Sequence, residues 1–500
     1  MPLTPRADLV ANSLEYETTA LVKATGFREY DVRWVLEKEI NLLGIQALGL
    51  GLGTYIHEIG VAPKVVVGHD YRSYSTSVKQ ALTLGLIGAG CEVFDIGLAL
   101  SPTAYFAQFE LDVPCVAMVT ASHNDNGWTG VKMGANKPLT FGPEEIGRLK
   151  EIVLSGTGAE RSGGKLTRAP GMMERYIADV ASRTQLKRKL RVLAACGNGT
   201  AGAFAPDALR RMGAEVIPMD CELDYTFPKY NPNPEDHEML QSMAEAVRRE
   251  GADLALGFDG DGDRCGVVDD TGEEIFADKI GLMLARDLSA LHPNATFIAD
   301  VKSTGLYATD EVLKANGATT VYWKTGHSYI KRKTAELGAL AGFEKSGHFF
   351  FNAPYGRGYD DGLVAASAIL AMLDRNPGKK LSELKAALPV AHTSLTMSPH
   401  CDDETKYGVV EDVVADYQAL AAGGGRILGR AIKEVITVNG VRVALEDGSW
   451  LLVRASSNKP ELVVVVESMA SADDMRALFH QEVKPRLAKR SEVGKYNQEI

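Results

Sequence analysis

The stretch KVVVGHDYRSYSTSVKQALTLGL, residues 64–86, decides the fold. An apolar, β-branched run leads into a polar loop, and the loop leads into a segment that is compatible with a helix. The same order returns in residues 190–213 and in residues 296–317. Strands that alternate with helices of this length predict α/β units, whose loops present ligands at the carboxyl ends of the strands. We therefore expect three similar α/β domains with mixed, largely parallel sheets.

The last part of the chain has a different pattern. Residues 431–470 alternate short apolar runs with turns, and Asn439-Gly440 and Asp447-Gly448 stand between such runs as hairpin signals. These features predict a smaller C-terminal α+β domain. The predicted domains are residues 1–183, 184–277, 278–389 and 390–500.

Composition argues against several classes of protein. Of the 500 residues, 45% are hydrophobic, which allows a sizeable core in each domain. A net charge of −11 argues against a general nucleic-acid surface. The apolar segment Gly362–Leu373 is too short for a bilayer, which takes about 20 residues, so we expect a core helix and no membrane contact. The mixed start of the chain and six cysteines without CxxC spacing favour an unprocessed cytoplasmic protein with free thiols.

An acidic loop stands between two apolar runs in LALGFDGDGDRCGVVDD, residues 254–270. Alternate side chains of an extended segment share one face, so Asp259, Asp261 and Asp263 can converge on a divalent cation. Arg264 occupies the sixth place, where an EF-hand needs glycine, which argues against that Ca²⁺ loop. An acidic surface turn is the other interpretation, but three like charges between buried strands repel without a counter-ion. The pattern favours a Mg²⁺ site with coordination positions open to a phosphate oxygen.

A serine, Ser122, stands in MVTASHNDNGWTG, residues 118–130. Taken alone, it is compatible with a turn residue or a helix N-cap. The Gly-x-Ser-x-Gly motif is absent, so a Ser-His-Asp hydrolase has little support. The role of this hydroxyl therefore depends on the motifs that accompany it.

Together, TASHNDNGWTGVKMG and GFDGDGDR resemble the α-D-phosphohexomutases, the family of phosphoglucomutase, phosphomannomutase and phosphoglucosamine mutase. The resemblance implies four domains around a central cleft, with Ser122 as a phosphoserine. It implies that Asp259, Asp261 and Asp263 hold Mg²⁺, with the Ser122 phosphate as the fourth ligand. It also implies interconversion of hexose 1-phosphate and hexose 6-phosphate, with mannose and/or glucose as the sugar, through a sugar 1,6-bisphosphate.

Further segments match the family in order: FREYDVR, GHDYR, GNGTAG, DVKST, KTGHSYIK, GFEKSGHFFF and RASSNKP. By this resemblance Lys132 and His348 take part in proton transfer. Taken singly, Lys132 is also compatible with a solvated strand end and His348 with a core imidazole. The implied substrate-binding residues are Tyr30, Arg33, Arg264, Lys302, Lys324, Gly326, His327, Glu344, Ser346, Arg454, Ser456, Ser457 and Asn458.

The sequence departs from the family pattern at four places. Trp34 stands where glycine is common, the Ser122 loop lacks the usual prolines, and Lys345 takes the variable place in the sugar loop. In the phosphate loop, Ser457 and Asn458 replace the commoner Asn and Thr. Phosphoglucosamine mutase is the alternative with the same chemistry. A Mg²⁺-dependent sugar phosphatase and a non-catalytic sugar-phosphate-binding protein are the alternatives from other classes. The expected partner is a hexose phosphate, and the expected assembly is a monomer or a homodimer.

Overall fold

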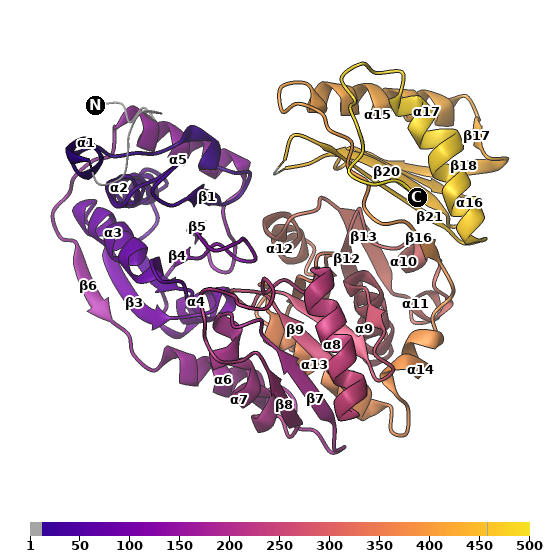
Figure 1. The fold of residues 1–500 in the computed structure, drawn as a ribbon, viewed down its shortest axis with the longest axis horizontal. Coiled ribbons are helices and arrows are strands. Elements are labelled where there is room, and N and C mark those ends of the chain that lie inside the picture. The colour runs from indigo at the N-terminus through magenta and orange to yellow at the C-terminus, as the bar shows by residue number, and fades with distance from the viewer. Residues whose placement is uncertain (1–12, 458) are drawn as a thin grey trace. The chain divides into compact units, whose positions relative to one another are not determined.

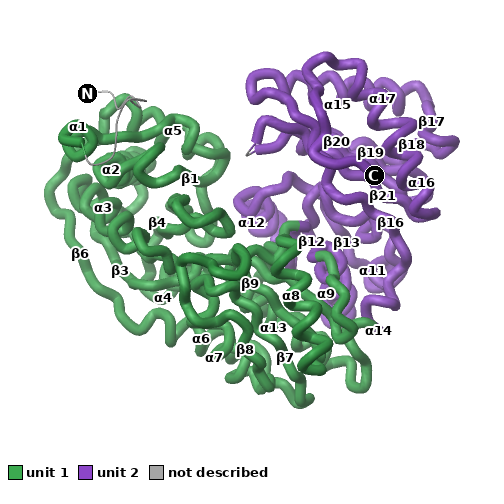
Figure 2. Tube along the Cα trace, viewed as in Figure 1, with its two compact units in different colours: residues 1–276, 346–382 green, residues 277–345, 383–500 purple. Residues whose placement is uncertain are grey.

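The structure is a computed structural model that describes residues 13–457 and 459–500, with helices and strands labelled in Figure 1. The chain divides into two compact units, which Figure 2 separates by colour. Unit 1 comprises the described residues up to 276 together with residues 346–382, and unit 2 comprises residues 277–345 and 383–500. The chain therefore enters unit 2, returns to unit 1 and enters unit 2 again.

The first sheet of unit 1 has six strands: β1 (Val32–Val35), β2 (Lys64–His69), β3 (Glu92–Leu98), β4 (Cys115–Val119), β5 (Trp128–Gly134) and β6 (Lys165–Arg168). Their order is β1-β5-β4-β2-β3-β6. β2 pairs in parallel with β3 and β4, whereas β5 runs antiparallel to β4 and β1, so the sheet is mixed. The helices of this part are α1 (Leu14–Thr18), α2 (Leu42–Glu58), α3 (Ser75–Gly88), α4 (Ser101–Glu110), α5 (Pro143–Ser155) and α6 (Met172–Ser182).

Trp34 on β1 is a core residue. Its side chain is fully buried and packs edge-on against Phe27, with ring centroids 5.3 Å apart. The indole Nε1 donates to Lys23 O at 2.7 Å. A Cβ on Gly26 would lie 1.8 Å from Nε1, so this glycine makes room for the indole. The departure at Trp34 therefore concerns the packing of the N-terminal segment.

The second sheet of unit 1 comprises β7 (Arg191–Ala195), β8 (Glu215–Met219), β9 (Leu254–Phe258), β10 (Cys265–Asp269) and β11 (Glu274–Ile275), in the order β11-β10-β9-β7-β8. β7 is parallel to β8 and β9, and β10 is antiparallel to β9. Helices α7 (Ala205–Arg211) and α8 (His237–Glu250) belong to it, and α8 packs on β9 and β10. After β15 (Phe349–Phe351) comes α13 (Gly362–Arg375), the predicted core helix, whose first amides are capped by the Asp361 carboxylate.

Unit 2 begins with α9 (Ala277–Leu291) and the parallel strands β12 (Thr296–Asp300), β13 (Thr319–Trp323) and β14 (Ala341–Phe343), ordered β13-β12-β14. The helix expected after β12 is broken into α10 (Leu306–Thr309) and α11 (Glu311–Ala315). Asp310 stands at the break in an extended conformation, and its carboxylate accepts the first free amides of α11. An N-cap residue leaves helical geometry, which is why a single helix does not form. Helix α12 (His327–Glu336) follows β13.

The last sheet is antiparallel and comprises β16 (His392–Thr393), β17 (Arg426–Ile427), β18 (Arg430–Ile436), β19 (Val441–Leu445), β20 (Trp450–Ala455) and β21 (Leu462–Ser468). Its helices are α15 (Lys406–Ala422), α16 (Ala472–Ala477) and α17 (Lys484–Leu487). Both predicted hairpin turns are confirmed, since Asn439-Gly440 joins β18 to β19 and Asp447-Gly448 joins β19 to β20. Along β20, Leu451 and Val453 belong to the core cluster that includes α15 residues, whereas Trp450 and Leu452 belong to a second cluster on the alternate face. Both faces of β20 are therefore buried, which explains why residues 450–453 are all apolar.

A buried arginine ties the last sheet to β12 within unit 2. The Arg442 guanidinium donates to Val301 O at 2.6 Å and to Ser303 O at 2.7 Å. It lies between two aromatic rings, 4.0 Å from the centroid of Tyr322 and 3.7 Å from that of Trp450. Carbonyl acceptors and ring faces together compensate the burial of a charge that has lost its water.

Glu467 on β21 is a second buried charged residue that connects the last sheet to the segment after β12. Because this contact uses the ionised carboxylate, its contribution to stability depends on pH. The carboxylate accepts hydrogen bonds from Thr304 Oγ1, Gly305 N and Trp450 Nε1 at 3.0, 2.7 and 2.8 Å. Burial opposes ionisation, but Lys279 and these donors lower the pKa of Glu467 to about 2. A depressed folded-state pKa stabilises the fold above the unfolded-state value of about 4.3, and the stabilisation is lost as the pH falls towards 2.

We expect Glu467→Gln to lower the free energy of unfolding by about 3 kcal/mol at pH 7, and by progressively less as the pH falls below about 4. Urea unfolding at a series of pH values measures this difference. Glu434→Gln, at an exposed position on β18, serves as the matched control and is expected to change little. A loss that does not vary with pH would contradict the role assigned to the Glu467 charge.

The architecture confirms the predicted fold class of three α/β domains with mixed sheets and a C-terminal domain built on an antiparallel sheet. Within the described ranges, every helix is either too short or too polar to span a membrane.

Candidate functional site

The turn between β9 and β10 carries the three aspartates of the acidic loop. Asp259, Asp261 and Asp263 are fully buried, and one oxygen from each lies within 4.8 Å of the others. The carboxylates converge through a tight turn, in which Gly262 adopts φ +71° and donates its amide to Asp259 O, rather than on one face of a strand. A Cβ on Gly260 would lie 2.4 Å from a backbone oxygen of the serine loop, so glycine lets the two loops touch.

The buried charges of this turn fit a divalent cation. Burial raises the pKa of Asp259 well above its usual value, and the carboxylates of Asp261 and Asp263 raise it further. Burial and Asp261 also raise the pKa of Asp263. One oxygen of Asp261 and one of Asp263 accept no hydrogen bond from the residues that the structure describes. Buried oxygen donors with too little positive charge around them suit a hard cation such as Mg²⁺.

Lys132 on β5 brings an ammonium group to the same turn. Its Nζ donates to Asp261 Oδ2 at 2.7 Å and also to Asp263. Burial acts to lower the pKa of Lys132, but these two carboxylates outweigh it and hold that pKa well above its usual value. Burial likewise acts to raise the pKa of Asp261, and Lys132 holds it below its usual value. In this arrangement Lys132 carries its proton and faces two carboxylates.

The hydroxyl of Ser122 faces the acidic turn from the loop between β4 and β5. Ser122 is buried, and its Oγ donates to Asp259 Oδ2 at 3.1 Å and lies 3.2 Å from His123 Nδ1. Burial, with Arg264 and Arg33 nearby, lowers the pKa of His123 well below its usual value, so this imidazole is neutral. The serine adopts a left-handed backbone at φ +52°, which turns its side chain toward the aspartates.

Two arginines hold the serine loop without the help of prolines. The Arg72 guanidinium donates to the backbone oxygens of Ser122, Asn124 and Asp125 at 3.1, 2.7 and 2.9 Å. Arg33, a predicted substrate-binding residue, donates to Asn124 Oδ1 at 2.5 Å. These bonds fix the loop from within the protein, which explains how it keeps one shape despite its proline-free sequence.

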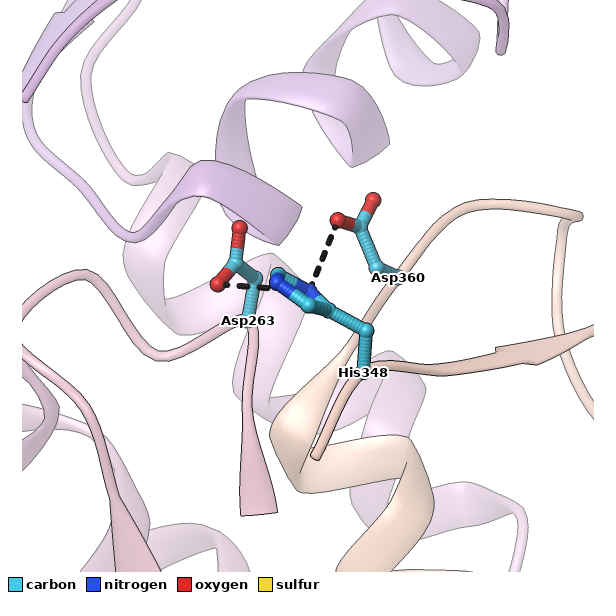
Figure 3. Close-up of side chains that lie close together, drawn as sticks. All are labelled: Asp263, His348 and Asp360. Carbon is cyan, nitrogen blue, oxygen red and sulfur yellow. Dashed lines mark ion pairs between the residues drawn. The ribbon is translucent and has the colours of Figure 1, made fainter. Parts of the chain in front are cut away.

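His348 lies among charged groups of the same unit, as Figure 3 shows for Asp263 and Asp360. Its Nδ1 is 3.2 Å from Asp360 Oδ2 and 3.7 Å from Asp263 Oδ1, while its Nε2 accepts from Arg264 Nε at 3.0 Å. Because Nε2 accepts from Arg264, Nδ1 is the ring nitrogen that faces the two carboxylates. Arg264 also reaches Asp259, with Nε 3.9 Å from Oδ2.

Unit 1 thus brings together seven of the predicted catalytic, metal and substrate residues: Ser122, Lys132, Asp259, Asp261, Asp263, Arg264 and His348. Arg33 contacts their loop. Tyr30, three residues before Arg33, is partly exposed, and Ser346, two residues before His348, is buried.

The predicted sugar-binding residues of unit 2 follow the carboxyl ends of neighbouring parallel strands. Lys302 follows β12, Lys324 follows β13 and Glu344 follows β14, while Gly326 and His327 begin α12. Asp300 holds these three loops together, because its carboxylate accepts from Ser303 Oγ at 2.5 Å, Thr325 Oγ1 at 2.9 Å and Lys345 N at 3.2 Å. The backbone of Lys345 is thereby fixed, whatever its side chain contributes to sugar choice.

The predicted phosphate-binding residues lie at the end of β20 and just after it: Arg454 is on β20, and Ser456 and Ser457 begin the loop between β20 and β21. Asn458, predicted with them, lies outside the described residues. Lys406, at the start of α15, is buried beneath this loop and donates to Ser456 O at 2.6 Å and Lys459 O at 3.0 Å. Both carbonyls therefore point toward the lysine.

Sequence reasoning missed four residues that organise the site: Arg72, Asp300, Asp360 and Lys406. The GHDYR and DVKST segments contain the first two, but nothing in either segment shows which side chain faces the neighbouring loops. Asp360 directly precedes the cap of a recognisable core helix. Lys406 carries no local signal, because its partners lie 50 and 53 residues away.

Comparison with known proteins agrees with this geometry. Four family models match in order: phosphoglucomutase/phosphomannomutase alpha/beta/alpha domains I, II and III at residues 24–159, 174–272 and 276–391, and the C-terminal domain at residues 402–484. A phosphomannomutase/phosphoglucomutase of Pseudomonas syringae pv. tomato is 34% identical over 92% of this chain and 95% of its own. A phosphoglucomutase of Neisseria gonorrhoeae is 31% identical over 89% and 93%.

Solved structures show the same likeness. A phosphoglucomutase/phosphomannomutase family protein from Burkholderia thailandensis superposes with a TM-score of 0.84 at 27% identity, covering 94% of this chain and 99% of that one. With four domain models matched in order and relatives similar along nearly their whole length, the chain belongs to the phosphoglucomutase/phosphomannomutase family.

Proposed function

We propose that the protein is a Mg²⁺-dependent phosphohexomutase. It interconverts hexose 1-phosphate and hexose 6-phosphate, with mannose and/or glucose as the sugar and the 1,6-bisphosphate as the intermediate. The observation that carries the proposal is the buried Ser122 hydroxyl 3.1 Å from Asp259, on a turn with two further buried carboxylates. Family membership and the names of the relatives support it.

In this proposal Ser122 Oγ carries the phosphoryl group and the surrounding side chains balance its charge. Mg²⁺ bound by the three aspartates would neutralise negative charge on the transferring group. The Lys132 ammonium and the Arg264 guanidinium supply further positive charge at the same turn. His348 exchanges a proton with the sugar hydroxyl as phosphoryl transfer proceeds, which requires its Nε2 to exchange the contact with Arg264 for the sugar.

Unit 2 would hold the sugar and its distal phosphate. Lys302, Lys324, His327 and Glu344 supply charged and hydrogen-bonding groups at the loops that Asp300 organises. Arg454, Ser456 and Ser457 supply the guanidinium fork and hydroxyls that suit a dianionic phosphate.

A product assay tests the function. Reduced protein with Mg²⁺ and a trace of glucose 1,6-bisphosphate is given glucose 1-phosphate, mannose 1-phosphate or glucosamine 1-phosphate. We expect the 6-phosphates of glucose and mannose without release of inorganic phosphate. Inorganic phosphate without 6-phosphate would instead support a phosphatase. A clear preference for glucosamine would make the protein a phosphoglucosamine mutase.

Lys406 is expected to act as a positioning residue for the phosphate loop. Because its ammonium holds two carbonyls of that loop, Lys406→Met should raise KM for the sugar phosphate about tenfold and change kcat less. Steady-state kinetics with glucose 1-phosphate measures the changes in KM and kcat separately. Lys433→Met, at an exposed position on β18, is the control. Equal losses in kcat and kcat/KM with unchanged KM would contradict a role in phosphate binding.

A further inference from the structure

Cys196 and Cys221 form a pair of thiols at one edge of the second sheet of unit 1. Cys196 directly follows β7, Cys221 lies two residues after β8, and these strands are parallel neighbours. The two sulfur atoms are 3.6 Å apart. Cys196 is buried and Cys221 is partly exposed, so the pair borders solvent on the Cys221 side.

Within this pair only Cys221 differs from the other thiols, because contact with Cys221 and burial raise the pKa of Cys196 well above its usual value. The other four cysteines are buried at Cys91, Cys115, Cys265 and Cys401. Burial raises the pKa of each, which disfavours the reactive thiolate. Contact with Cys196 lowers the pKa of Cys221, although burial opposes this. Cys221 is therefore the attacking sulfur of the pair, and Cys196 stands beside it as the resolving thiol.

Cys196 also begins the loop that supports the acidic turn. Gly199 donates its amide to Cys196 O at 2.8 Å, and Thr200 donates its amide to Gly260 O at 3.2 Å. Gly260 stands between the first two aspartates of the turn. Sulfurs joined in a disulfide are about 2.05 Å apart, so forming the bond draws residues 196–200 toward the segment after β8. Such a movement would shift Thr200, whose amide contacts the acidic turn at Gly260 O.

We propose that Cys196 and Cys221 form a reversible disulfide when the protein meets a peroxide, and that this bond slows the reaction at the acidic turn. The Cys221 thiol releases its proton, and the thiolate attacks one oxygen of hydrogen peroxide. The O–O bond breaks, a sulfenic acid forms, and the departing hydroxide takes up the released proton to become one water. The Cys196 thiol then attacks the sulfenic sulfur, the S–S bond forms, and the hydroxyl leaves with the thiol proton as a second water. Two thiols are oxidised and one peroxide is reduced to two waters.

Mass spectrometry of the full chain tests the bond itself. Reduced protein is treated with hydrogen peroxide, and its intact mass and non-reduced peptides are measured. We expect the loss of two hydrogen atoms, a peptide that links Cys196 to Cys221, and reversal by dithiothreitol. Cys221→Ser and Cys196→Ala abolish the link, whereas the matched Cys115→Ser keeps it. No link, or a sulfinic acid on Cys221 in its place, overturns the proposal.

The rate of turnover tests the second part of the proposal, namely that the disulfide slows the reaction. This part rests on the proposed mutase function. Since a misplacement of about 1 Å at a catalytic site can cost up to about 10² in rate, we expect oxidation to lower turnover about tenfold and dithiothreitol to restore it. Cys221→Ser keeps its turnover in peroxide. A linked peptide with unchanged turnover overturns the effect on the reaction. Absence of mutase activity in the reduced protein refutes the proposed function instead, while the linked peptide still supports the disulfide.

Discussion

Replacing Ser122 with alanine is expected to lower kcat by a factor of about 10⁴ or more. The Ser122 oxygen is the atom that accepts and returns the phosphoryl group in the proposed reaction, and an alanine methyl group cannot carry it. Alanine tolerates the left-handed backbone at φ +52° about as well as serine does, so the loop keeps its shape. Steady-state turnover of glucose 1-phosphate measures the loss.

Two measurements separate chemistry from folding in this variant. After incubation with glucose 1,6-bisphosphate, intact mass should show one added phosphoryl group in the wild type and none in Ser122→Ala. Ser73→Ala, an exposed serine of the same domain, should behave as the wild type. Full turnover by a well-folded Ser122→Ala protein would refute the mechanism.

Asp263→Asn is expected to lower activity without lowering the stability of the metal-free protein. The variant removes one buried carboxylate whose pKa burial and Asp261 raise, so the metal-free protein should unfold at a higher temperature or at an unchanged one. Lys132 keeps its partner Asp261 at 2.7 Å, so no ammonium group is stranded. Turnover should fall by about 10² or more, because the turn attracts the cation less strongly.

A Mg²⁺ titration of turnover, together with thermal unfolding in a chelator, measures both effects. The Mg²⁺ concentration for half-maximal activity should rise at least about tenfold. Asp236→Asn is the matched control: it removes a carboxylate from the same sheet region but keeps the N-cap acceptor of α8. An unchanged Mg²⁺ requirement in Asp263→Asn would contradict the assignment of this turn as the metal site.

Much of this architecture could be predicted from sequence because local patterns specify it. The β-branched runs, the loops after them and the hairpin glycines each lie within a few residues of the element that they determine. The acidic turn was predictable as a cluster because its three aspartates occupy five consecutive positions. Its geometry was not, because the positive φ of Gly262 and the contact of Gly260 with the serine loop arise only in the folded chain.

The rest of the site depends on partners far apart in the sequence. Arg264 and His348 meet across 84 residues, and Arg72 meets Asn124 across 52. A single arginine or lysine looks like any solvated side chain until the fold buries it. Asp310 shows the same limit on a smaller scale, since a periodic apolar pattern does not reveal which polar residue interrupts a helix to cap the next one.

The buried contact that Arg442 and Glu467 make between the last sheet and the segment after β12 has a consequence for the length of the substrate. It joins the segment after β12 to the last sheet, so the packing of unit 2 sets the spacing between the proposed sugar loops after β12, β13 and β14 and the proposed phosphate loop after β20. In the proposed reaction the sugar 1,6-bisphosphate presents first one phosphate and then the other to Ser122, so it must fit this spacing in both orientations. We therefore expect a sugar phosphate that is shorter or longer than a hexose to stop after a single transfer.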